Sequence, residues 1–410
     1  MKLAFLTVRY GPDILGGAEQ AVRGLAEHLA GDGVDVEVHT TCAVDAVTWA
    51  DAVPAGTVVE AGVTVHRHRS AAGRDPGFEA FSASVLADPA RQPPGLQERW
   101  LHLQGPVCPD AVAGAAGSGA DLVVCSPYLY WPTVEAVRRL GSRVMLHPAA
   151  HDEPPIHLPV FGATFASVGG LAYYTDAERR LVERLWPGLA ATPQRVVGLG
   201  IDPDDGAGAD PPHFRATSGV GDRPYVLCLG RVDAGKGTGV LARFFATYKR
   251  RHPGPTALVF AGPVVHPPEP HPDVVVTGPL SDADKWSALA GAAVVVNPSV
   301  NESFSIVLLE AWAVGRPVLV NGRCGATSEH VRRSHGGLVF GSYAGFETAL
   351  GRLLEQPRLA QALGASGHGY VETGFSWPVV TARYRRWLER VSTRPRSPVA
   401  RRSSTTVVES

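Results

Sequence analysis

The feature that most constrains the fold of this chain is an alternation of short apolar runs with amphipathic stretches. It begins at the N-terminus and begins again near residue 223. Leu3–Val8 is a compact apolar run typical of a strand buried on both faces. Ala18–Ala30 has apolar residues at helical spacing and is followed by glycines, which favours a helix that ends there. Strands alternating with helices predict an α/β fold whose parallel sheet has helices on both faces.

The same pattern predicts further elements in the first half. We expect a hairpin at Val58–His68, helices at Thr133–Leu140 and Asp176–Leu185, and strands at Val34–Thr40, Leu122–Cys125, Val144–His147 and Leu171–Thr175. Arg74–Asp110 shows no clear periodicity and is expected to be irregular. Gly198–Asp222 is rich in Gly, Pro and Asp, which is typical of an interdomain connection.

The second half repeats the organisation of the first. Strands are expected at Tyr225–Leu229, Ala257–Ala261, Val274–Val276, Ala293–Asn297 and Pro317–Val320, and helices at Gly239–Arg250, Phe304–Val314, Phe346–Leu353 and Leu359–Gly367. A chain of 410 residues is also too long for one ordinary core, so two doubly wound domains are expected. We assign residues 1–200 to the first, 201–222 to a linker and 223–376 to the second. A last amphipathic helix covers 377–391, and the Arg/Ser-rich residues 393–410 are expected to be disordered.

Composition excludes several classes of function. The net charge of −1 gives no overall field for nucleic acid or for a polybasic membrane anchor. We expect no signal peptide, because the apolar start is broken at Arg9, and no run is long enough to span a bilayer. The five scattered cysteines are expected to be reduced, which indicates a cytoplasmic protein. Arg179, Arg180 and the basic tail leave peripheral contact with anionic lipid open.

The most informative segment is Asn297–Asn321, which follows an expected strand and contains two glutamates separated by seven residues, Glu302 and Glu310. Ser303 or Ser305 is a candidate side-chain cap for the helix that follows. The free N–H groups at that helix start would stabilise a diphosphate. Glu310 lies in an otherwise apolar run, so it needs a partner. A ribose diol matches its carboxylate, and a structural arginine or backbone N–H is the alternative.

A second segment, Gly230–Gly237, follows a strand directly. Its glycines allow the backbone to approach a ligand, and Arg231 and Lys236 supply two cations for a diphosphate. The chain has only four lysines, so a lysine here is notable. The phosphate-loop frame GxxxxGK[ST] is absent because Gly237 follows Lys236. A basic surface turn is the alternative.

Two further loops follow strands of the first half. Gly16 and Gly17 precede a helix start, which presents N–H groups to phosphate or forms a tight structural turn. The loop His147–Pro155 contains His151 next to Asp152 and Glu153. Their spacing matches no known set of metal ligands, so we expect no metal site in this loop. His151 is instead expected to hydrogen-bond an acceptor or a transferring sugar, or to be an ordinary loop histidine.

Together these segments resemble the retaining glycosyltransferases of family 4, which have the GT-B fold of two Rossmann-like domains facing each other across a cleft. The resemblance covers most of the chain. It rests on the E-x7-E segment NESFSIVLLEAWAVGRPVLV, on GRVDAGKG and on ILGGAEQ. It implies that residues 223–376 bind the nucleotide sugar, that residues 1–200 hold the acceptor, and that the helix 377–391 crosses back to the first domain.

The resemblance also implies roles for single residues. Arg231 and Lys236 would neutralise the donor diphosphate, and Glu310 would bind the ribose. Glu302 would hold the donor sugar together with the helix start, that is Ser303, Phe304, Ser305 and Ile306. His151 would touch the transferring sugar, and Gly16 and Gly17 would face the sugar and phosphates. Backbone around Gly278, Pro279 and Leu280 would hold the base. The family's GGxxE stretch is replaced here by Gly322–Glu329, so contacts from that stretch are left open.

The function expected is transfer of a sugar, with retention, from a UDP- or GDP-sugar to a hydroxyl acceptor in polysaccharide, glycolipid or natural-product biosynthesis. No cofactor and no metal are expected. A catalytically silent GT-B protein that binds sugar nucleotides or acts as a scaffold is the alternative. A phosphorylase would usually need a lysine for pyridoxal phosphate, and an NAD-binding protein would show GxGxxG, which is absent.

Overall fold

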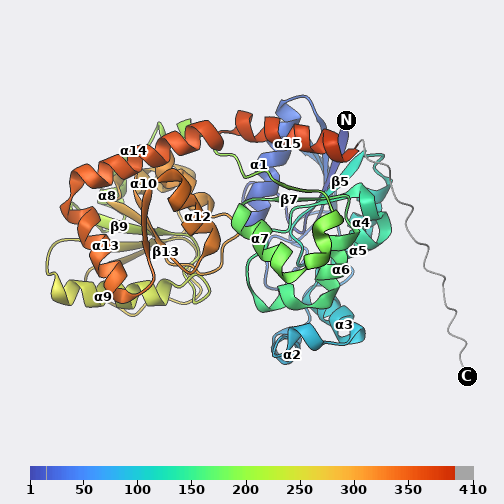
Figure 1. Cartoon of the computed structure of the whole chain (residues 1–410), viewed down its shortest axis with the longest axis horizontal. Helices are drawn as coiled ribbons and strands as arrows, with labels where there is room; N and C mark the ends of the chain where they lie inside the picture. The colour runs from blue at the N-terminus through green and yellow to red at the C-terminus, as the bar shows by residue number, and fades with distance from the viewer. Residues whose placement is uncertain (15, 393–410) are drawn as a thin grey trace, which may run out of the picture.

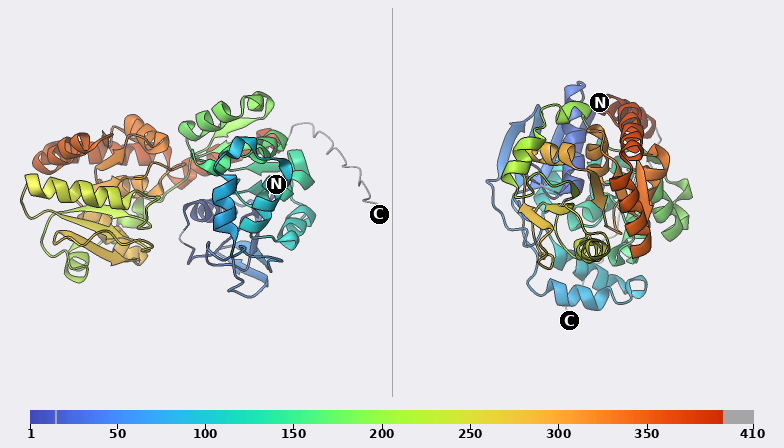
Figure 2. Two further views of the ribbon diagram at one scale, coloured as in Figure 1. Left: turned by 90° about the horizontal axis from the view of Figure 1, so that it is seen from below. Right: turned by 90° about the vertical axis from the view of Figure 1, so that its left-hand side faces the viewer.

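The computed structural model describes residues 1–14 and 16–392, and it contains two parallel sheets that lie side by side (Figure 1). The tail 393–410, expected to be disordered, lies outside the described residues. Figure 2 shows the two lobes from two further directions, with the second lobe coloured yellow to orange. Among the described residues no helix is long and apolar enough to cross a membrane.

The first sheet has the strand order β3-β4-β2-β1-β5-β6-β7-β8. All neighbours are parallel except the edge hairpin β3–β4, which turns at Ala61 and Gly62 as the sequence predicts. The strands are β1 (Lys2–Leu6), β2 (Asp35–Thr41), β3 (Gly56–Glu60), β4 (Val63–His68), β5 (Leu122–Cys125), β6 (Val144–Leu146), β7 (Gly170–Tyr173) and β8 (Gln194–Val196).

The second sheet has the order β11-β10-β9-β12-β13-β14 and is parallel throughout. Its central strands are buried except at the carboxyl ends of β9 and β12, and they are rich in Val, Leu and Ala, as expected when helices cover both faces. The strands are β9 (Tyr225–Leu229), β10 (Ala257–Ala261), β11 (Val274–Gly278), β12 (Val294–Asn297), β13 (Val318–Asn321) and β14 (Gly337–Phe340).

Helices cover both faces of each sheet and bury separate apolar clusters on the two sides. Around the first sheet lie α1 (Gly17–Gly31), α4 (Pro109–Gly117), α5 (Trp131–Leu140), α6 (Pro159–Ser167) and α7 (Asp176–Leu185). Around the second lie α8 (Pro211–Thr217), α9 (Thr238–Arg251), α10 (Asp282–Gly291), α11 (Ile306–Ala313), α12 (Gly325–Ser334), α13 (Tyr343–Glu355) and α14 (Pro357–Gly374). The expectation of two doubly wound sheets is confirmed.

The prediction that Arg74–Asp110 is irregular is wrong. The segment contains α2 (Phe78–Val85) and α3 (Pro94–Gln104), which contact each other, and it ends at the start of α4. The helices are short and their apolar contacts are carried by a few large side chains such as Trp100, whose ring meets those of Phe78 and Phe161. So few anchors produce almost no amphipathic periodicity, which is why the sequence pattern does not reveal them.

The last helix, α15 (Trp377–Ser392), follows α14 after two residues and packs on the first lobe (Figure 1). The Trp377 ring stacks on His28 of α1 with centroids 4.1 Å apart. Gly24 of α1 makes room for it, since a Cβ there would lie 2.4 Å from the indole. Further along, the Tyr384 hydroxyl is 3.0 Å from Nε2 of His147. The helix therefore ties the end of the chain to the first sheet.

Candidate active site

Loops at the carboxyl ends of the two sheets meet each other. Thr175, just after β7, donates a hydrogen bond from Oγ1 to the carbonyl of Ser303, in the loop after β12, at 3.0 Å. Next to it the rings of Tyr174 and Phe304 pack with centroids 6.1 Å apart. Ligands of parallel α/β sheets bind at these carboxyl ends, so the candidate site lies where the two sets of loops come together.

Lys236 and Glu302 form an ion pair, with Nζ 2.7 Å from Oε1. They come from loops after β9 and β12, neighbouring strands of the second sheet. The approach depends on Gly237, whose φ is 73° and at which a Cβ would lie 2.9 Å from the carbonyl oxygen of Pro298. The Lys236 side chain is 37% exposed, so its ammonium group is accessible to a ligand.

Arg231 belongs to the same loop and pairs with Asp233. Asp233 also accepts a hydrogen bond from the backbone N–H of Lys236 at 2.7 Å. One buried carboxylate therefore organises both cations, a role that the sequence pattern did not identify. The Arg231 guanidinium is 58% exposed.

Two asparagines hold the loop that carries Glu302. The Asn297 side chain accepts a hydrogen bond from Ser299 N at 2.9 Å and donates one to Ser305 Oγ at 2.8 Å. Asn321 donates to the carbonyl of Pro298 at 3.0 Å. The loop is thus closed at both ends, which fixes the position of Glu302 relative to Lys236.

The predicted side-chain cap of the helix in this segment is wrong. The helix α11 begins at Ile306, and neither Ser303 nor Ser305 caps it with its side chain. Ser305 has φ 72°, a left-handed conformation unusual for a residue other than glycine, and its Oγ accepts from Asn297 instead. Phe304 is buried in the core, so only its backbone faces the loop. Among the described residues, no side chain therefore accepts a hydrogen bond from the first N–H groups of α11.

Glu310 has a partner that the sequence analysis missed. Its carboxylate is buried and lies 3.1 Å from Nζ of Lys285 in α10, which also pairs with Asp282 at 3.2 Å. Burial by itself would lower the pKa of Lys285, but the negative charges of Glu310 and Asp282 outweigh it and raise that pKa. The signal available in the sequence was the scarcity of lysine, because Lys285 is one of only four.

The connection between β11 and α10 directly precedes the helix that carries Lys285. Gly278, the last residue of β11, has φ 74°, and no described residue other than its chain neighbours has an atom within 4 Å of the place where a Cβ would stand. Leu280 packs at the edge of the apolar cluster around Trp286 and Leu308. Gly278 thus ends β11, Leu280 lies in the turn before α10, and Lys285 of α10 pairs with Glu310 of α11.

His151 lies in the loop after β6, with Nδ1 3.7 Å from the carboxylate of Glu153. The loop is held by Glu178 of α7, a fully buried carboxylate that accepts from the N–H groups of Ala150 at 2.8 Å and Tyr174 at 2.7 Å. Burial raises the pKa of Glu178 to about 8. Sequence reasoning placed Glu178 on a helix and did not identify this role. The reason is that its carboxylate accepts from N–H groups in two different loops, those after β6 and β7.

Gly16 and Gly17 stand at the start of α1. A Cβ at Gly16 would lie 2.0 Å from Oε2 of Glu19, whereas Gly17 faces open space. Glu19 is buried and pairs with Arg9, whose Nε is 3.0 Å from its Oε1. The Arg9–Glu19 pair, also missed, occupies the space that a side chain at position 16 would need.

Comparisons with known proteins are consistent with this geometry. Residues 223–356 match the family model "Glycosyl transferases group 1". The chain is 31% identical over 394 residues to a D-inositol 3-phosphate glycosyltransferase of Frankia alni, covering 88% of this chain and 91% of the relative. The chain belongs to the group 1 glycosyltransferases.

Two further similarities bear on this glycosyltransferase. It is 32% identical over 292 residues to a GDP-mannose-dependent alpha-(1-6)-phosphatidylinositol monomannoside mannosyltransferase of Mycolicibacterium smegmatis, covering 65% of this chain and 73% of that one. It superposes on the crystal structure of Anabaena HepE in complex with UDP-glucose with a TM-score of 0.68 at 16% identity, covering 95% of this chain and 100% of that one. The fold is GT-B.

The predicted site residues of the glycosyltransferase fall into separate contact groups. Lys236 contacts Glu302, and Arg231 is linked to Lys236 through Asp233. Glu310 contacts Lys285 instead. Across residues 1–14 and 16–392, no hydrogen bond or ion pair joins His151 or Gly16 to the Lys236–Glu302 pair.

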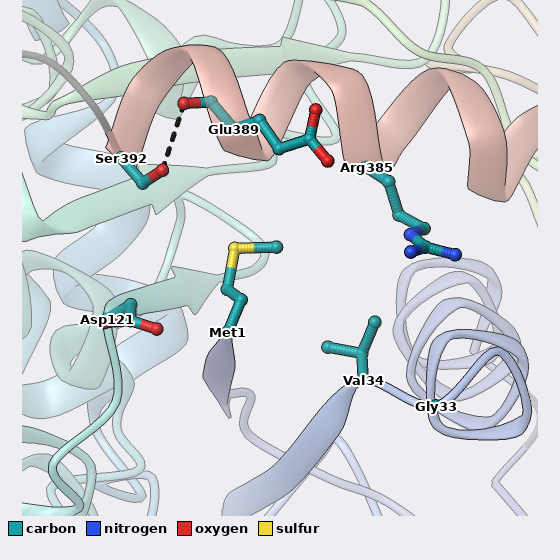
Figure 3. A pocket seen from close by; sticks show the side chains of 7 residues that line it. All are labelled: Met1, Gly33, Val34, Asp121, Arg385, Glu389 and Ser392. Carbon is teal, nitrogen blue, oxygen red and sulfur yellow. Dashed lines mark hydrogen bonds between the residues drawn. The ribbon is translucent and has the colours of Figure 1, made fainter.

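A hollow at the opposite end of the first sheet contains none of the predicted site residues (Figure 3). It lies between α15 and the amino ends of β1, β2 and β5, and it is lined by Met1, Gly33, Val34, Asp121, Arg385, Glu389 and Ser392. Parallel sheets bind ligands at their carboxyl ends, so we do not assign the glycosyl-transfer site to this hollow.

Proposed function

We propose that this glycosyltransferase is a retaining enzyme of family 4 that moves a sugar from a UDP- or GDP-sugar to a hydroxyl acceptor. The observation that supports this most strongly is the Lys236–Glu302 ion pair beside the start of α11. It brings together, at the carboxyl end of the second sheet, a cation, a carboxylate and a helix start that no side chain of the described residues caps.

Breaking a sugar–phosphate bond leaves negative charge on the diphosphate. Lys236 and Arg231 are exposed enough to reach that charge, and the N–H groups at the start of α11 add the positive end of a helix dipole. When the donor binds, Lys236 exchanges part of its pairing with Glu302 for the phosphates. Glu302 is then free to accept hydrogen bonds from sugar hydroxyls.

On the side of the first sheet, we propose that His151 and the start of α1 at Gly17 face the transferring sugar and the acceptor. Loop contacts such as Thr175–Ser303 hold the two sheets close enough for both substrates to be positioned together. Retention then follows a same-face route in which the leaving phosphate helps to deprotonate the acceptor. In this proposal the chemistry uses no metal ion.

We propose that Gly278 and Leu280 hold the nucleotide base and Glu310 the ribose. The identity of the nucleotide is left open, since the name of the Mycolicibacterium smegmatis relative specifies GDP-mannose and the Anabaena HepE structure contains UDP-glucose. Both curated relatives carry inositol in their names, so inositol phosphates and phosphatidylinositol mannosides are the first acceptors to test. We place the enzyme in the cytoplasm, in polysaccharide, glycolipid or natural-product biosynthesis.

The test is a transfer assay of the full chain with a panel of UDP- and GDP-sugars. Lys236→Ala should lower kcat/KM by about 100-fold, because it removes a fixed donor to the leaving group. Arg231→Ala should act in the same direction. Arg91→Ala is the matched control, because Arg91 is 86% exposed and belongs to the short 3-10 helix Pro89–Arg91, outside the second lobe.

Full activity in both the Lys236 and Arg231 variants would contradict the assigned site. A wild-type protein that binds a sugar nucleotide in calorimetry but turns over no donor with any acceptor would contradict the enzymatic proposal and favour a silent binding protein.

A further inference from the structure

Three histidines and a glutamate gather near one edge of the first sheet, on the face that packs against α4. Glu37 and His39 alternate on β2, so they share one face of the sheet. The parallel register pairs His39 with His66 on β4, which puts both imidazoles side by side. One ligand atom from each of Glu37, His39 and His66 lies within 4.8 Å of the others.

The rings are held in fixed orientations. Nδ1 of His39 is 3.1 Å from Nε2 of His68, and Nδ1 of His66 is 2.9 Å from Oγ1 of Thr57 on β3. Nε2 of His39 is 3.1 Å from Oε1 of Glu37. Metal-binding histidines in proteins use one ring nitrogen for the metal and hydrogen-bond the other, which fixes the ring, and here both imidazoles have the second nitrogen engaged.

The neighbouring helix leaves room for these rings. Gly114 of α4 faces the cluster, and a Cβ at this position would lie 2.6 Å from Nδ1 of His39 and 3.2 Å from Cε1 of His68. The rings of His39 and His66 stack with centroids 4.7 Å apart. The space around the imidazoles is therefore shaped by the packing of α4 on the sheet.

The carboxylate is oriented as well. Oε2 of Glu37 pairs with Nζ of Lys2 at 2.9 Å, and Lys2 in turn donates to the carbonyl of Ser118 at 2.8 Å. Oε1 of Glu37 is left facing His39. Two imidazole nitrogens and a carboxylate oxygen form the mixed donor set that suits Zn²⁺ and related divalent transition metals, and not Mg²⁺ or Ca²⁺.

We propose that Glu37, His39 and His66 bind a divalent transition metal of the Zn²⁺ class, with His68 orienting His39. The site is distinct from the proposed glycosyl-transfer site, because its imidazoles pack against Gly114 of α4 on one face of the first sheet, and not against the loops that carry Lys236 and Glu302. A bound ion would connect β2 to β4. Its role is therefore to stabilise the edge of the acceptor-side sheet, where β3 and β4 pair only with each other and with β2.

The test uses tag-free full-length protein, stripped with EDTA and dialysed, in calorimetry with ZnCl₂ and in thermal unfolding. We expect one equivalent of Zn²⁺ to bind and raise Tm, and MgCl₂ at the same concentration to do neither. Replacing Zn²⁺ by Co²⁺ should give the visible absorption bands of a nitrogen- and oxygen-ligated ion.

His66→Gln should abolish stoichiometric Zn²⁺ binding, and His68→Gln should weaken it about tenfold, because only the orienting ring is lost. His252→Gln is the matched control and should bind as the wild type does, since His252 is an exposed histidine that also pairs with a glutamate. Glu37→Gln provides a second ligand variant if His66→Gln does not fold.

Absence of stoichiometric Zn²⁺ binding by the wild type would overturn the proposal. So would Zn²⁺ binding by folded His66→Gln and Glu37→Gln proteins with the affinity of the wild type. Neither result depends on glycosyl transfer, because the transfer activity of the same protein samples is measured in a separate assay.

Discussion

At the scale of single residues, two buried histidines tie stability to pH. His147 and His330 are almost completely inaccessible to solvent. Burial lowers the pKa of each to about 3, and for His330 the charge of Arg333 acts in the same direction. In the unfolded chain both rings become protonated near pH 6.5. In the folded protein they stay uncharged well below that pH.

We expect the free energy of unfolding to fall as the pH decreases from 6.5. Above pH 6.5 a histidine with a depressed folded-state pKa is uncharged in both the folded and the unfolded protein. Below pH 6.5 only the unfolded chain takes up the proton, so acidification favours the unfolded state. Each ring should cost about 1.4 kcal/mol per pH unit below 6.5. Urea titrations of the wild type at pH 5.5 and 7.5 measure the difference, and His147→Gln should reduce it by about 1.4 kcal/mol. An unchanged difference in His147→Gln would contradict the assignment, and His252→Gln, exposed at the surface, serves as the control.

At the scale of secondary structure, the contact between α10 and α11 joins the proposed ribose site to the fold. Ser281 caps α10 by accepting from the N–H of Asp284 at 3.1 Å, and the first turn of the helix places Lys285 against Glu310. The sequence analysis did not predict α10, because its apolar residues form only a short and weak stripe. The partner of Glu310 was missed for the same reason.

Glu310→Gln should distinguish the contribution of the ribose to ligand binding from that of the diphosphate. If Glu310 binds the ribose, this variant should weaken binding of UDP or GDP, whichever the protein accepts, by about tenfold, since one charged hydrogen-bond acceptor is lost. Binding of inorganic pyrophosphate, which has no ribose, should stay unchanged. Calorimetry with both ligands measures this, and Lys285→Met is the companion variant that removes only the partner. Equal losses for both ligands, or none for either, would exclude a ribose role for Glu310.

At the scale of the whole molecule, α7 and α12 connect the two lobes through a group of charged residues. The Glu329 carboxylate is buried and accepts from Arg180 at 2.6 Å and from the N–H of Asp176 at 3.1 Å. Arg333 pairs with Asp176 across the same contact at 3.2 Å. Arg179 and Arg180, which the sequence left open for contact with lipid, are both engaged in ion pairs within the protein.

Glu329→Ala should lower the free energy of unfolding by about 2 kcal/mol, because it leaves the backbone N–H of Asp176 without its acceptor. Small-angle scattering should show a larger radius of gyration as the lobes separate. Arg333→Ala is the control and should cost less than about 1 kcal/mol, since its guanidinium is 54% exposed. Equal stability of wild type and Glu329→Ala would show that the lobes are held together without the Glu329 contacts.

The sequence by itself determined the two-sheet architecture and the loops that carry the candidate site. Buried parallel strands must be continuously apolar, as in Leu3–Leu6 and Tyr225–Leu229, so their pattern is local and can be recognised. The loops after such strands must lie at one edge of the sheet, so Gly230–Gly237 and Asn297–Asn321 are expected to reach one diphosphate. In the structure Lys236 of the first segment contacts Glu302 of the second.

Only the tertiary structure decided the partners of the charged residues and the conformation of single loop positions. Glu310 pairs with Lys285, Glu178 holds the His151 loop, and Glu329 joins the lobes, each through contacts between distant parts of the chain. Ser305 adopts a left-handed φ because Asn297 and the packing of Phe304 constrain it, whereas its residue type alone favours a cap. A buried charge requires some partner, but which one it finds depends on how separate elements pack, and no local pattern records that.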